Sequence, residues 1–207
     1  MTRAVEPCEY HKGCAPQAGK APPLKEAGYI RYNRAMVRFR RIEDRDRIFF
    51  VTTNVARGIR DFSPAERDTI LDVLAAQRAP RTFLLFGYAI MPDHIHLLLT
   101  PREHTLIRVL RDLKSKTGYE IARRRRSPGP VWQPRYFDNI IRRVQHFWEK
   151  LEYIHQNPVE AALVSEPEDW KWSSYRFYAK TGPVAVVPDT VDLPADKNAL
   201  LWPAPWR

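Results

Sequence analysis

The sequence predicts an α+β fold in which helices pack on a mainly antiparallel sheet of four to five strands. Segments rich in β-branched and aromatic residues alternate with segments of helical apolar periodicity, in the order strand, helix, strand, strand, helix, strand, helix. Only Met91-Pro92-Asp93 separates the second and third strands, which is too short for anything except a tight hairpin turn. A hairpin combined with helical crossovers gives one sheet with helices packed on it.

The first half of this fold follows from strand composition and helix-start signals. Residues 47–55 form a β-branched and aromatic run, which indicates a strand. The tetrapeptide Ser63-Pro64-Ala65-Glu66 predicts a helix start, with serine as the N-cap, proline in the first helical position and glutamate completing a capping box. This helix is expected to extend over residues 64–79. Residues 82–90 and 94–99 predict the two strands of the hairpin.

The second half is predicted in the same way. Residues 105–124 carry apolar side chains on one stripe and basic side chains on the other, which predicts a long helix. Ser127-Pro128-Gly129-Pro130 ends it, and residues 131–141, which are extended and aromatic, predict a fourth strand. The last helix is expected over residues 144–156, where Asn157-Pro158 stops it.

Composition bounds the class of protein. The chain has 207 residues and is 44% hydrophobic, which is enough for a real core. No apolar run approaches the roughly 20 residues needed to cross a bilayer, and the N-terminus lacks the apolar segment of a secretory signal. We therefore expect a cytoplasmic protein without a membrane partner. The expected organisation is a flexible N-terminal tail at 1–28, a domain at 29–182 and a Pro-rich C-terminal tail at 183–207.

The charge balance indicates a polyanionic partner. Lys and Arg total 34 and Asp and Glu total 24, which gives a formal net charge of +10. Most of the basic residues are arginine, whose guanidinium group pairs with phosphate and stacks on bases. Nucleic acid is therefore the favoured class of partner. The two cysteines belong to Cys8-x-x-His11-x-x-Cys14, which is one ligand short of a closed zinc site, and we interpret this motif as part of the tail.

A pair of histidines is the first candidate site. His94 and His96 are two residues apart in a predicted strand, so both side chains point to one face while Ile95 and Leu97 point to the other. Two neutral imidazoles on one face can chelate a divalent cation. The alternative is a pair of surface histidines that alternate with core residues, and the sequence leaves both interpretations open.

A tyrosine at the end of the last helix is the second candidate. Tyr153 and Asn157 are four residues apart and therefore share a helix face. Tyr153 lies at the edge of the predicted buried stripe, where a tyrosine commonly packs its ring and leaves its hydroxyl in water. The helix position alone therefore favours a structural tyrosine.

The basic helix and the segment after it are the third candidate. Arg123 to Arg126 are consecutive and repel one another unless an anion approaches, although a solvated helix face is the alternative. Aromatic residues such as Tyr136 and Phe137 could stack on unpaired bases. The expected DNA contacts are Arg108, Arg111, Lys114, Arg123, Arg124, Arg125, Arg126, Trp132 and Arg135.

Four motifs taken together resemble one known family. They are Gly87–Leu99 (GYAIMPDHIHLLL), Trp132–Asp138 (WQPRYFD), Tyr153–Val164 (YIHQNPVEAALV) and Trp172–Tyr175 (WSSY). In this order and spacing they resemble the single-tyrosine transposases of the insertion-sequence-200-like type, and among these most of all the branch associated with repetitive extragenic palindromes (REP). The resemblance extends over about residues 45 to 178.

The resemblance implies a ferredoxin-like or RRM-like HUH endonuclease fold and a metal-dependent activity on single-stranded DNA near hairpins. His94, His96 and Asn157 would hold Mg²⁺ or Mn²⁺, and Tyr153 would be the nucleophile that forms a 5′-phosphotyrosine, with Tyr136 as a competitor. Relatives of this type work as monomers or homodimers, and such a protein would be nucleoid-associated when bound. Two alternatives stay open, namely a domesticated hairpin-binding protein without cleavage activity and a replication-initiator or relaxase-type nickase.

Overall fold

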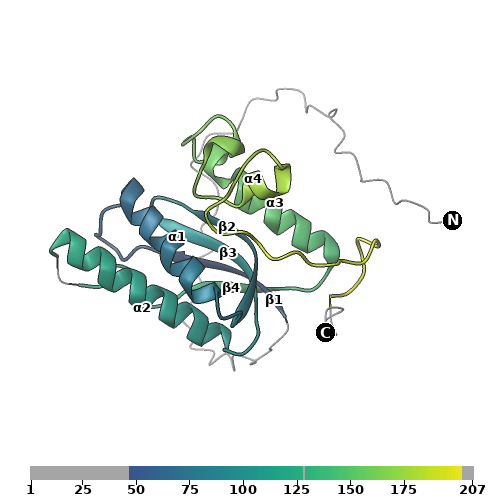
Figure 1. Cartoon of the computed structure of the whole chain (residues 1–207), viewed down its shortest axis with the longest axis horizontal. Helices are drawn as coiled ribbons and strands as arrows, with labels where there is room; N and C mark the ends of the chain where they lie inside the picture. The colour runs from purple at the N-terminus through teal and green to yellow at the C-terminus, as the bar shows by residue number, and fades with distance from the viewer. Residues whose placement is uncertain (1–46, 128, 202–207) are drawn as a thin grey trace, which may run out of the picture. The chain divides into compact units, whose positions relative to one another are not determined.

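The computed structural model describes residues 47–127 and 129–201, all of which lie in a compact unit formed by Arg41–Arg207. The predicted order of strands and helices is confirmed, with two short helical turns added after it. The elements are β1 (Ile48–Asn54), α1 (Pro64–Arg78), β2 (Phe83–Ile90), β3 (His94–Pro101), α2 (Leu106–Arg125), β4 (Phe137–Ile141), α3 (Val144–Glu160), the 3₁₀ turn η1 (Pro167–Asp169) and α4 (Tyr175–Ala179) (Figure 1).

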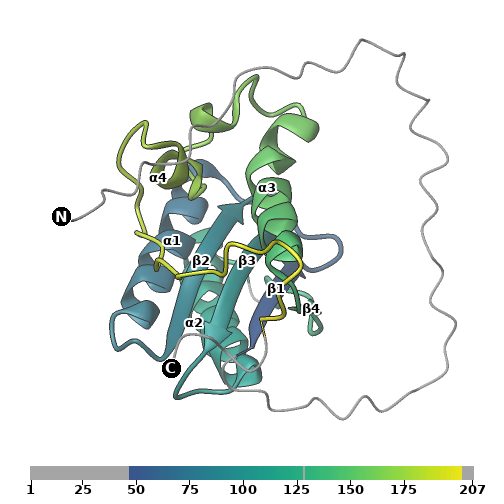
Figure 2. The ribbon, with the colours of Figure 1, turned by 90° about the vertical axis from the view of Figure 1, so that its right-hand side faces the viewer.

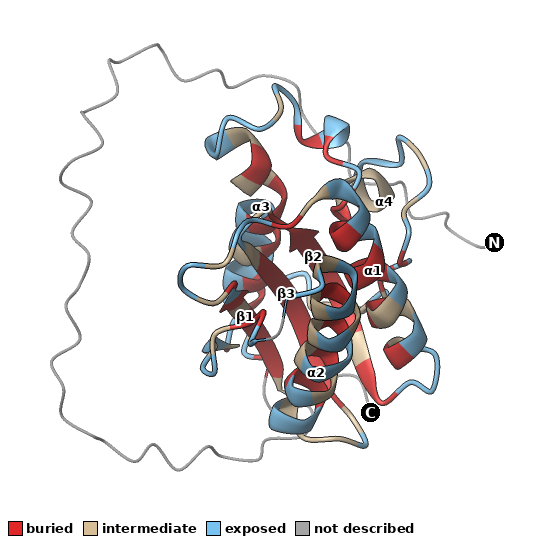
Figure 3. Ribbon diagram, turned by 90° about the vertical axis from the view of Figure 1, so that its left-hand side faces the viewer, coloured by how far each residue is buried: buried red, intermediate tan, exposed pale blue. Residues whose placement is uncertain are grey.

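The four strands form one sheet in the order β2-β3-β1-β4, and every neighbouring pair is antiparallel. Figure 2 shows α3 across one face of this sheet, and Figure 3 shows α1 and α2 in front of the opposite face. The predicted α+β class, with an antiparallel sheet between packed helices, is therefore confirmed. β1 and β3 are the central strands, and their apolar residues are buried on both faces.

Side-chain caps begin both α1 and α2, and the cap of α1 is the predicted one. Ser63 accepts a hydrogen bond from the backbone N–H of Glu66, and the Glu66 carboxylate accepts one from the backbone N–H of Ser63, which completes the capping box. Thr105 caps α2 in a similar way by accepting from the N–H of Arg108. α1 thus begins directly after its predicted cap, and α2 begins one residue after its predicted start.

The fourth strand is shorter than predicted. β4 begins at Phe137 rather than at Val131. In the segment before it, Trp132 forms an isolated bridge with Val55. The ammonium group of Lys114 donates to the carbonyls of Gln133 and Pro134, at 2.5 and 3.2 Å. Residues 131–133 still pair with the end of β1, since the N–H of Gln133 donates to Asn54 and the N–H of Ala56 donates to Val131. Pro134 has no N–H donor for a ladder, which resumes only at β4.

Helix α3 is longer than predicted, because it continues through Pro158 to Glu160. A proline inside a helix removes one N–H donor, and the sequence pattern suggested an end there. The turn is closed instead by the N–H of Ala161, which donates to Asn157, and by the N–H of Leu163, which donates to Pro158. Pro158 itself is buried, so packing of its ring accompanies the helical turn.

The described part of the Pro-rich C-terminal segment lacks helix and strand but packs on the domain. The Asp189 carboxylate accepts hydrogen bonds from the Arg78 guanidinium and from the N–H of Leu85. The N–H groups of Val144 and Gln145 donate to backbone carbonyls of residues 197–199, although no side chain caps α3. This segment therefore supplies the acceptors at the start of α3.

Two predictions concern the remaining parts of the chain. The N-terminal tail at 1–28, with Cys8, His11 and Cys14, lies outside the described residues. Within residues 47–127 and 129–201, no helix is both long and apolar enough to cross a membrane.

Candidate active site

The imidazoles of His94 and His96 converge at the start of β3. Both residues lie on the sheet face that α3 covers, and their Nε2 atoms are 3.0 Å apart. The intervening Ile95 and the following Leu97 are fully buried. The alternation predicted from the sequence thus brings the two rings together, at a centroid distance of 4.5 Å.

Each imidazole is oriented through its other nitrogen. The Nδ1 atom of His94 donates to the Asp93 carboxylate at 2.6 Å, and the Nδ1 atom of His96 lies 2.9 Å from the Thr52 hydroxyl. Thr52 reaches His96 because the two residues are direct partners in the β1–β3 register. Such partners fix the tautomer and the ring orientation of metal-binding histidines.

The donor set fits a divalent cation. Burial, together with the nearby charges of His94 and Lys150, lowers the pKa of His96 to about 3, so this ring is neutral at neutral pH. Adjacent ligands of an octahedral ion at about 2.1 Å are roughly 3 Å apart, which agrees with the separation of the two Nε2 atoms. The described residues contain no cluster of three or more His, Cys, Asp and Glu side chains, so a third protein ligand would be of another type.

Tyr153 of α3 lies directly beside these histidines. Its ring makes an edge-on contact with His96, with centroids 5.3 Å apart, and another with Phe50 at 5.8 Å. Tyr153 is 38% exposed, in agreement with its predicted place at the edge of the buried stripe. Burial raises the pKa of Tyr153, and Glu160 acts in the same direction. The phenol is therefore protonated at neutral pH.

Asn157 accompanies Tyr153 on the same face of α3. A hydrogen bond with its side chain counteracts part of the rise in the pKa of Tyr153. Because α3 continues past Pro158, Asn157 is held inside the helix rather than in a turn after it. The predicted spacing of four residues therefore joins the tyrosine and the amide.

The four consecutive arginines at the end of α2 do not form one free basic patch. Arg125 is buried and forms an ion pair with Glu66, whereas Arg123 pairs with Glu120 at the surface. Arg124 donates to the hydroxyl of Thr69. Two of the four arginines therefore have acidic partners within the domain, one in α1 and one in the preceding turn of α2.

The other residues expected to contact DNA fall into two groups. Arg108 and Arg111 are exposed and lie near Asp112, and Arg135 is exposed as well. Trp132 is buried, and its indole N–H donates to the hydroxyl of Thr117 at 2.8 Å. Trp132 is thus a core residue rather than the exposed aromatic side chain that the sequence suggested.

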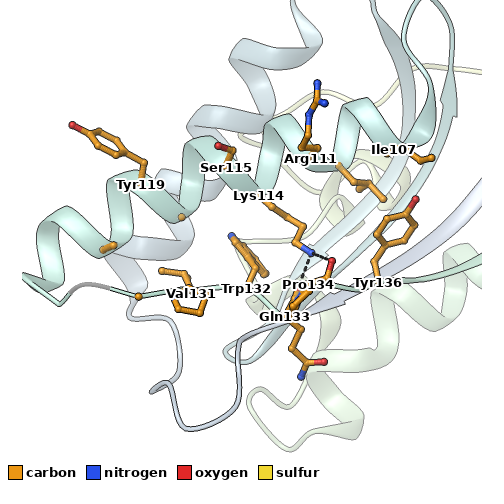
Figure 4. Close-up of a pocket in the computed structure, with 15 residues that line it drawn as sticks. Ile107, Arg111, Lys114, Ser115, Tyr119, Val131, Trp132, Gln133, Pro134 and Tyr136 are labelled. Carbon is orange, nitrogen blue, oxygen red and sulfur yellow. Dashed lines mark hydrogen bonds between the residues drawn. The ribbon is translucent and has the colours of Figure 1, made fainter. Parts of the chain in front are cut away.

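A pocket of about 560 Å³ lies between α2 and residues 129–136 (Figure 4). Lys114 points across it to the carbonyls of Gln133 and Pro134, and Tyr136 lines it. Tyr136, predicted within a strand, therefore lies before β4 and faces α2. The tyrosine that contacts His96 is Tyr153.

Sequence reasoning missed three residues around the histidines, namely Phe50, Thr52 and Lys150. Phe50 stacks on His96, and the Lys150 ammonium lies 5.1 Å from the Phe50 ring centroid and 5.4 Å from that of Tyr153. The spacing of three residues between Lys150 and Tyr153 could have indicated the lysine. The two β1 residues depend on strand register, which the sequence alone does not specify.

Comparisons with known proteins agree with this geometry. Residues 62–157, which include both histidines, Tyr153 and Asn157, match the family model of IS200-like transposases. The REP-associated tyrosine transposase of Escherichia coli K12 is 21% identical over 169 residues, which cover 80% of this chain and 99% of that protein.

A putative REP-associated tyrosine transposase of Haemophilus influenzae is 30% identical over 104 residues, or 45% of this chain and 59% of that protein. A solved structure of a REP-associated tyrosine transposase bound to a REP hairpin matches with a TM-score of 0.61 and 20% identity, over 79% of this chain and 98% of that one. The fold is thus shared with that protein. The resemblance predicted from the motifs is confirmed: the chain is related to the IS200-like transposases and is similar to their REP-associated members.

Proposed function

We propose that this protein is a metal-dependent endonuclease and strand transferase that cleaves single-stranded DNA near hairpins through a 5′-phosphotyrosine on Tyr153. The observation that carries the proposal is the convergence of the His94 and His96 Nε2 atoms at 3.0 Å, with the Tyr153 ring against His96. The hairpin named for the matching solved structure supports the choice of substrate.

The reaction that these residues suit is a transesterification. The Tyr153 oxygen attacks the scissile phosphorus and loses its proton, the bond from phosphorus to the 3′ oxygen breaks, and the 3′ oxygen takes up a proton. The covalent tyrosine ester conserves the energy of the phosphodiester, so a 3′-hydroxyl of another strand can reverse the step without ATP.

His94, His96 and Asn157 would hold Mg²⁺ or Mn²⁺. When bound, the cation would stabilise the charge that develops on the scissile phosphate as a Lewis acid. The Asp93 carboxylate and the Thr52 hydroxyl hold the two imidazoles in orientation. Asn157 also acts on Tyr153, since their hydrogen bond favours loss of the phenolic proton.

We propose that the DNA contacts are made by the exposed basic residues of the predicted set. These are Arg108, Arg111, Arg123, Arg124, Arg126 and Arg135. Lys114, Arg125 and Trp132 are less exposed and make hydrogen bonds within the domain. Because Tyr153 reaches His96 of its own chain, we also propose that one copy contains a complete site and acts as a monomer.

Incubation of the purified protein with labelled hairpin DNA from the flanks of its own gene, with and without Mn²⁺, tests the proposal. A covalent protein–DNA adduct on a denaturing gel is expected for the parent protein and for Tyr136→Phe, but not for Tyr153→Phe. Binding without any adduct would instead indicate a hairpin-binding protein. An adduct that persists in Tyr153→Phe would assign the nucleophile to another residue.

A further inference from the structure

One exposed aromatic ring continues the row of side chains that contains the candidate site. Across the sheet, Ala89, His96, Thr52 and Phe137 are direct partners in successive strands β2, β3, β1 and β4. Directly opposed residues of antiparallel strands point to the same face. Phe137 therefore lies on the α3 face of the edge strand, beside the threonine that orients His96.

Phe137 is 54% exposed, whereas His96 in the same row is buried. Adjacent strands are about 4.8 Å apart, so two strand spacings place Phe137 roughly 10 Å from His96. A group that stacks on this ring is thus close to the reacting phosphate but separate from it. The ring faces solvent at the edge of the sheet, where a flexible strand of nucleic acid has access.

Lys150 of α3 supplies positive charge at the same site. Its ammonium lies over the rings of Phe50 and Tyr153, and within the described part of the chain it forms no ion pair. Phe50 is buried beneath it and pairs with β4 at Asn139. The row that leads to His96 therefore ends in the exposed ring of Phe137, and the Lys150 ammonium lies over Phe50, two residues along β1 from Thr52 of that row.

We infer that Phe137 and Lys150 form a nucleotide subsite, in which an unpaired base next to the cleavage point stacks on the Phe137 ring and a backbone phosphate contacts the Lys150 ammonium. This inference rests on the proposed function, because the strand must enter the site of Tyr153. Aromatic stacking tolerates every base, and a lysine reads only charge, so the subsite positions the strand without selecting its sequence.

Binding measurements in the Tyr153→Phe background test the subsite without loss of DNA to cleavage. The probe is hairpin DNA from the flanks of the gene, with a single abasic site moved through its unpaired positions. Phe137→Ala should weaken binding about 5- to 150-fold, which corresponds to one lost stacking contact. An abasic site at one position should weaken binding of the Phe137 protein but not of Phe137→Ala.

Three further variants make the result specific. Phe137→Leu keeps an apolar side chain but lacks the aromatic face, and should bind as weakly as Phe137→Ala, whereas Phe137→Trp should restore binding. Trp148→Ala removes another exposed aromatic side chain, from α3, and should bind like the parent. Equal affinity of Phe137→Ala, Phe137→Leu and the parent would overturn the stacking contact.

The phosphate contact is tested by salt dependence. Lys150→Gln should reduce the slope of log affinity against log salt concentration by about 0.7, and Lys150→Arg should keep it. An unchanged slope in Lys150→Gln would overturn the contact. Adduct formation by the parent protein separates failure of the subsite from failure of the proposed function. If the parent forms an adduct and all variants bind DNA as the parent does, only the subsite is refuted. If the parent forms no adduct, the proposed function is refuted.

Discussion

Arg125, at the end of α2, and Glu66, in the first turn of α1, form a buried ion pair with two contacts, Nε to Oε1 at 2.7 Å and Nη2 to Oε2 at 2.9 Å. The side chains are 7% and 4% exposed. The pair connects the two helices that cover the same face of the sheet. Glu66 accepts in addition from the Ser63 N–H and from Arg60, so one carboxylate joins a helix cap to a tertiary contact.

Arg125→Ala should therefore destabilise the fold by about 3 kcal/mol, since removal of one partner leaves a buried charge with fewer compensating contacts. Urea unfolding measures this change. Arg126→Ala is the matched control. Arg126 is adjacent to Arg125 but exposed, so this substitution should change the free energy of unfolding by less than about 0.5 kcal/mol. Similar losses for both variants would show that the ion pair contributes little to stability.

Acid should weaken the fold through Glu66. Burial alone would raise the pKa of Glu66, but hydrogen bonds from Arg125 and Ser63 and the charges of Arg125 and Arg60 outweigh it and lower the pKa from 4.5 to about 2. A carboxyl with a lower pKa in the folded state stabilises that state above the unfolded pKa. This contribution is lost as the pH falls from about 4.5 to about 2.

Unfolding free energies at pH 6 and at pH 3 check this expectation. The parent should lose more stability over this interval than Glu66→Gln, because other carboxyl groups affect both proteins alike. Parallel pH profiles for the two proteins would contradict the assignment to Glu66.

The sequence was most informative where the signal is local. The capping box at Ser63 and the alternation of His94 with His96 need only neighbouring residues, and both agree with the structure. Helix spacing likewise joined Tyr153 to Asn157. These features depend on the periods of a helix and a strand, which a single sequence contains.

Contacts between distant segments could not be predicted in this way. Glu66 pairs with Arg125 across 59 residues, and Lys114 donates to the carbonyl of Gln133 across 19 residues. Thr52 meets His96 only because β1 pairs with β3 in one register. The arginines at 123–126 and the extended segment at 131–141 were therefore interpreted from composition alone. Their contacts in the structure depend on partners that lie far away in the sequence.

Gly87→Ala should destabilise the protein by about 1–3 kcal/mol. A Cβ at this position would lie 2.5 Å from Cδ1 of Leu151, a buried residue of α3, so either this side chain or the helix that carries Tyr153 must shift. Gly118→Ala is the control, because its Cβ would make an ordinary 3.6 Å contact with Cδ1 of Trp132, and alanine favours a helix over glycine by up to about 1 kcal/mol. Thermal unfolding of both variants should give changes of opposite sign. A neutral Gly87→Ala would mean that Leu151 has room to move.

Thr52→Val should weaken Mn²⁺ binding about 10-fold or more while leaving the fold intact. When the Nε2 lone pair of His96 binds a cation, the ring proton is on Nδ1, and the Thr52 hydroxyl at 2.9 Å is its acceptor. Valine has the same shape but no oxygen, so the buried N–H would lose its partner. Thr52→Ser keeps the oxygen and should keep the affinity.

The neighbouring threonine provides the control for this experiment. Thr53 is fully buried, and within the described residues its hydroxyl has no hydrogen-bond partner. Because successive residues of a strand point to opposite faces, Thr53 lies on the face away from the histidines. Thr53→Val should therefore leave Mn²⁺ affinity, measured by titration calorimetry, at the parent value. If Thr52→Val and Thr53→Val bind Mn²⁺ equally well, Thr52 does not orient a metal ligand, and the contact between its hydroxyl and His96 serves the fold alone.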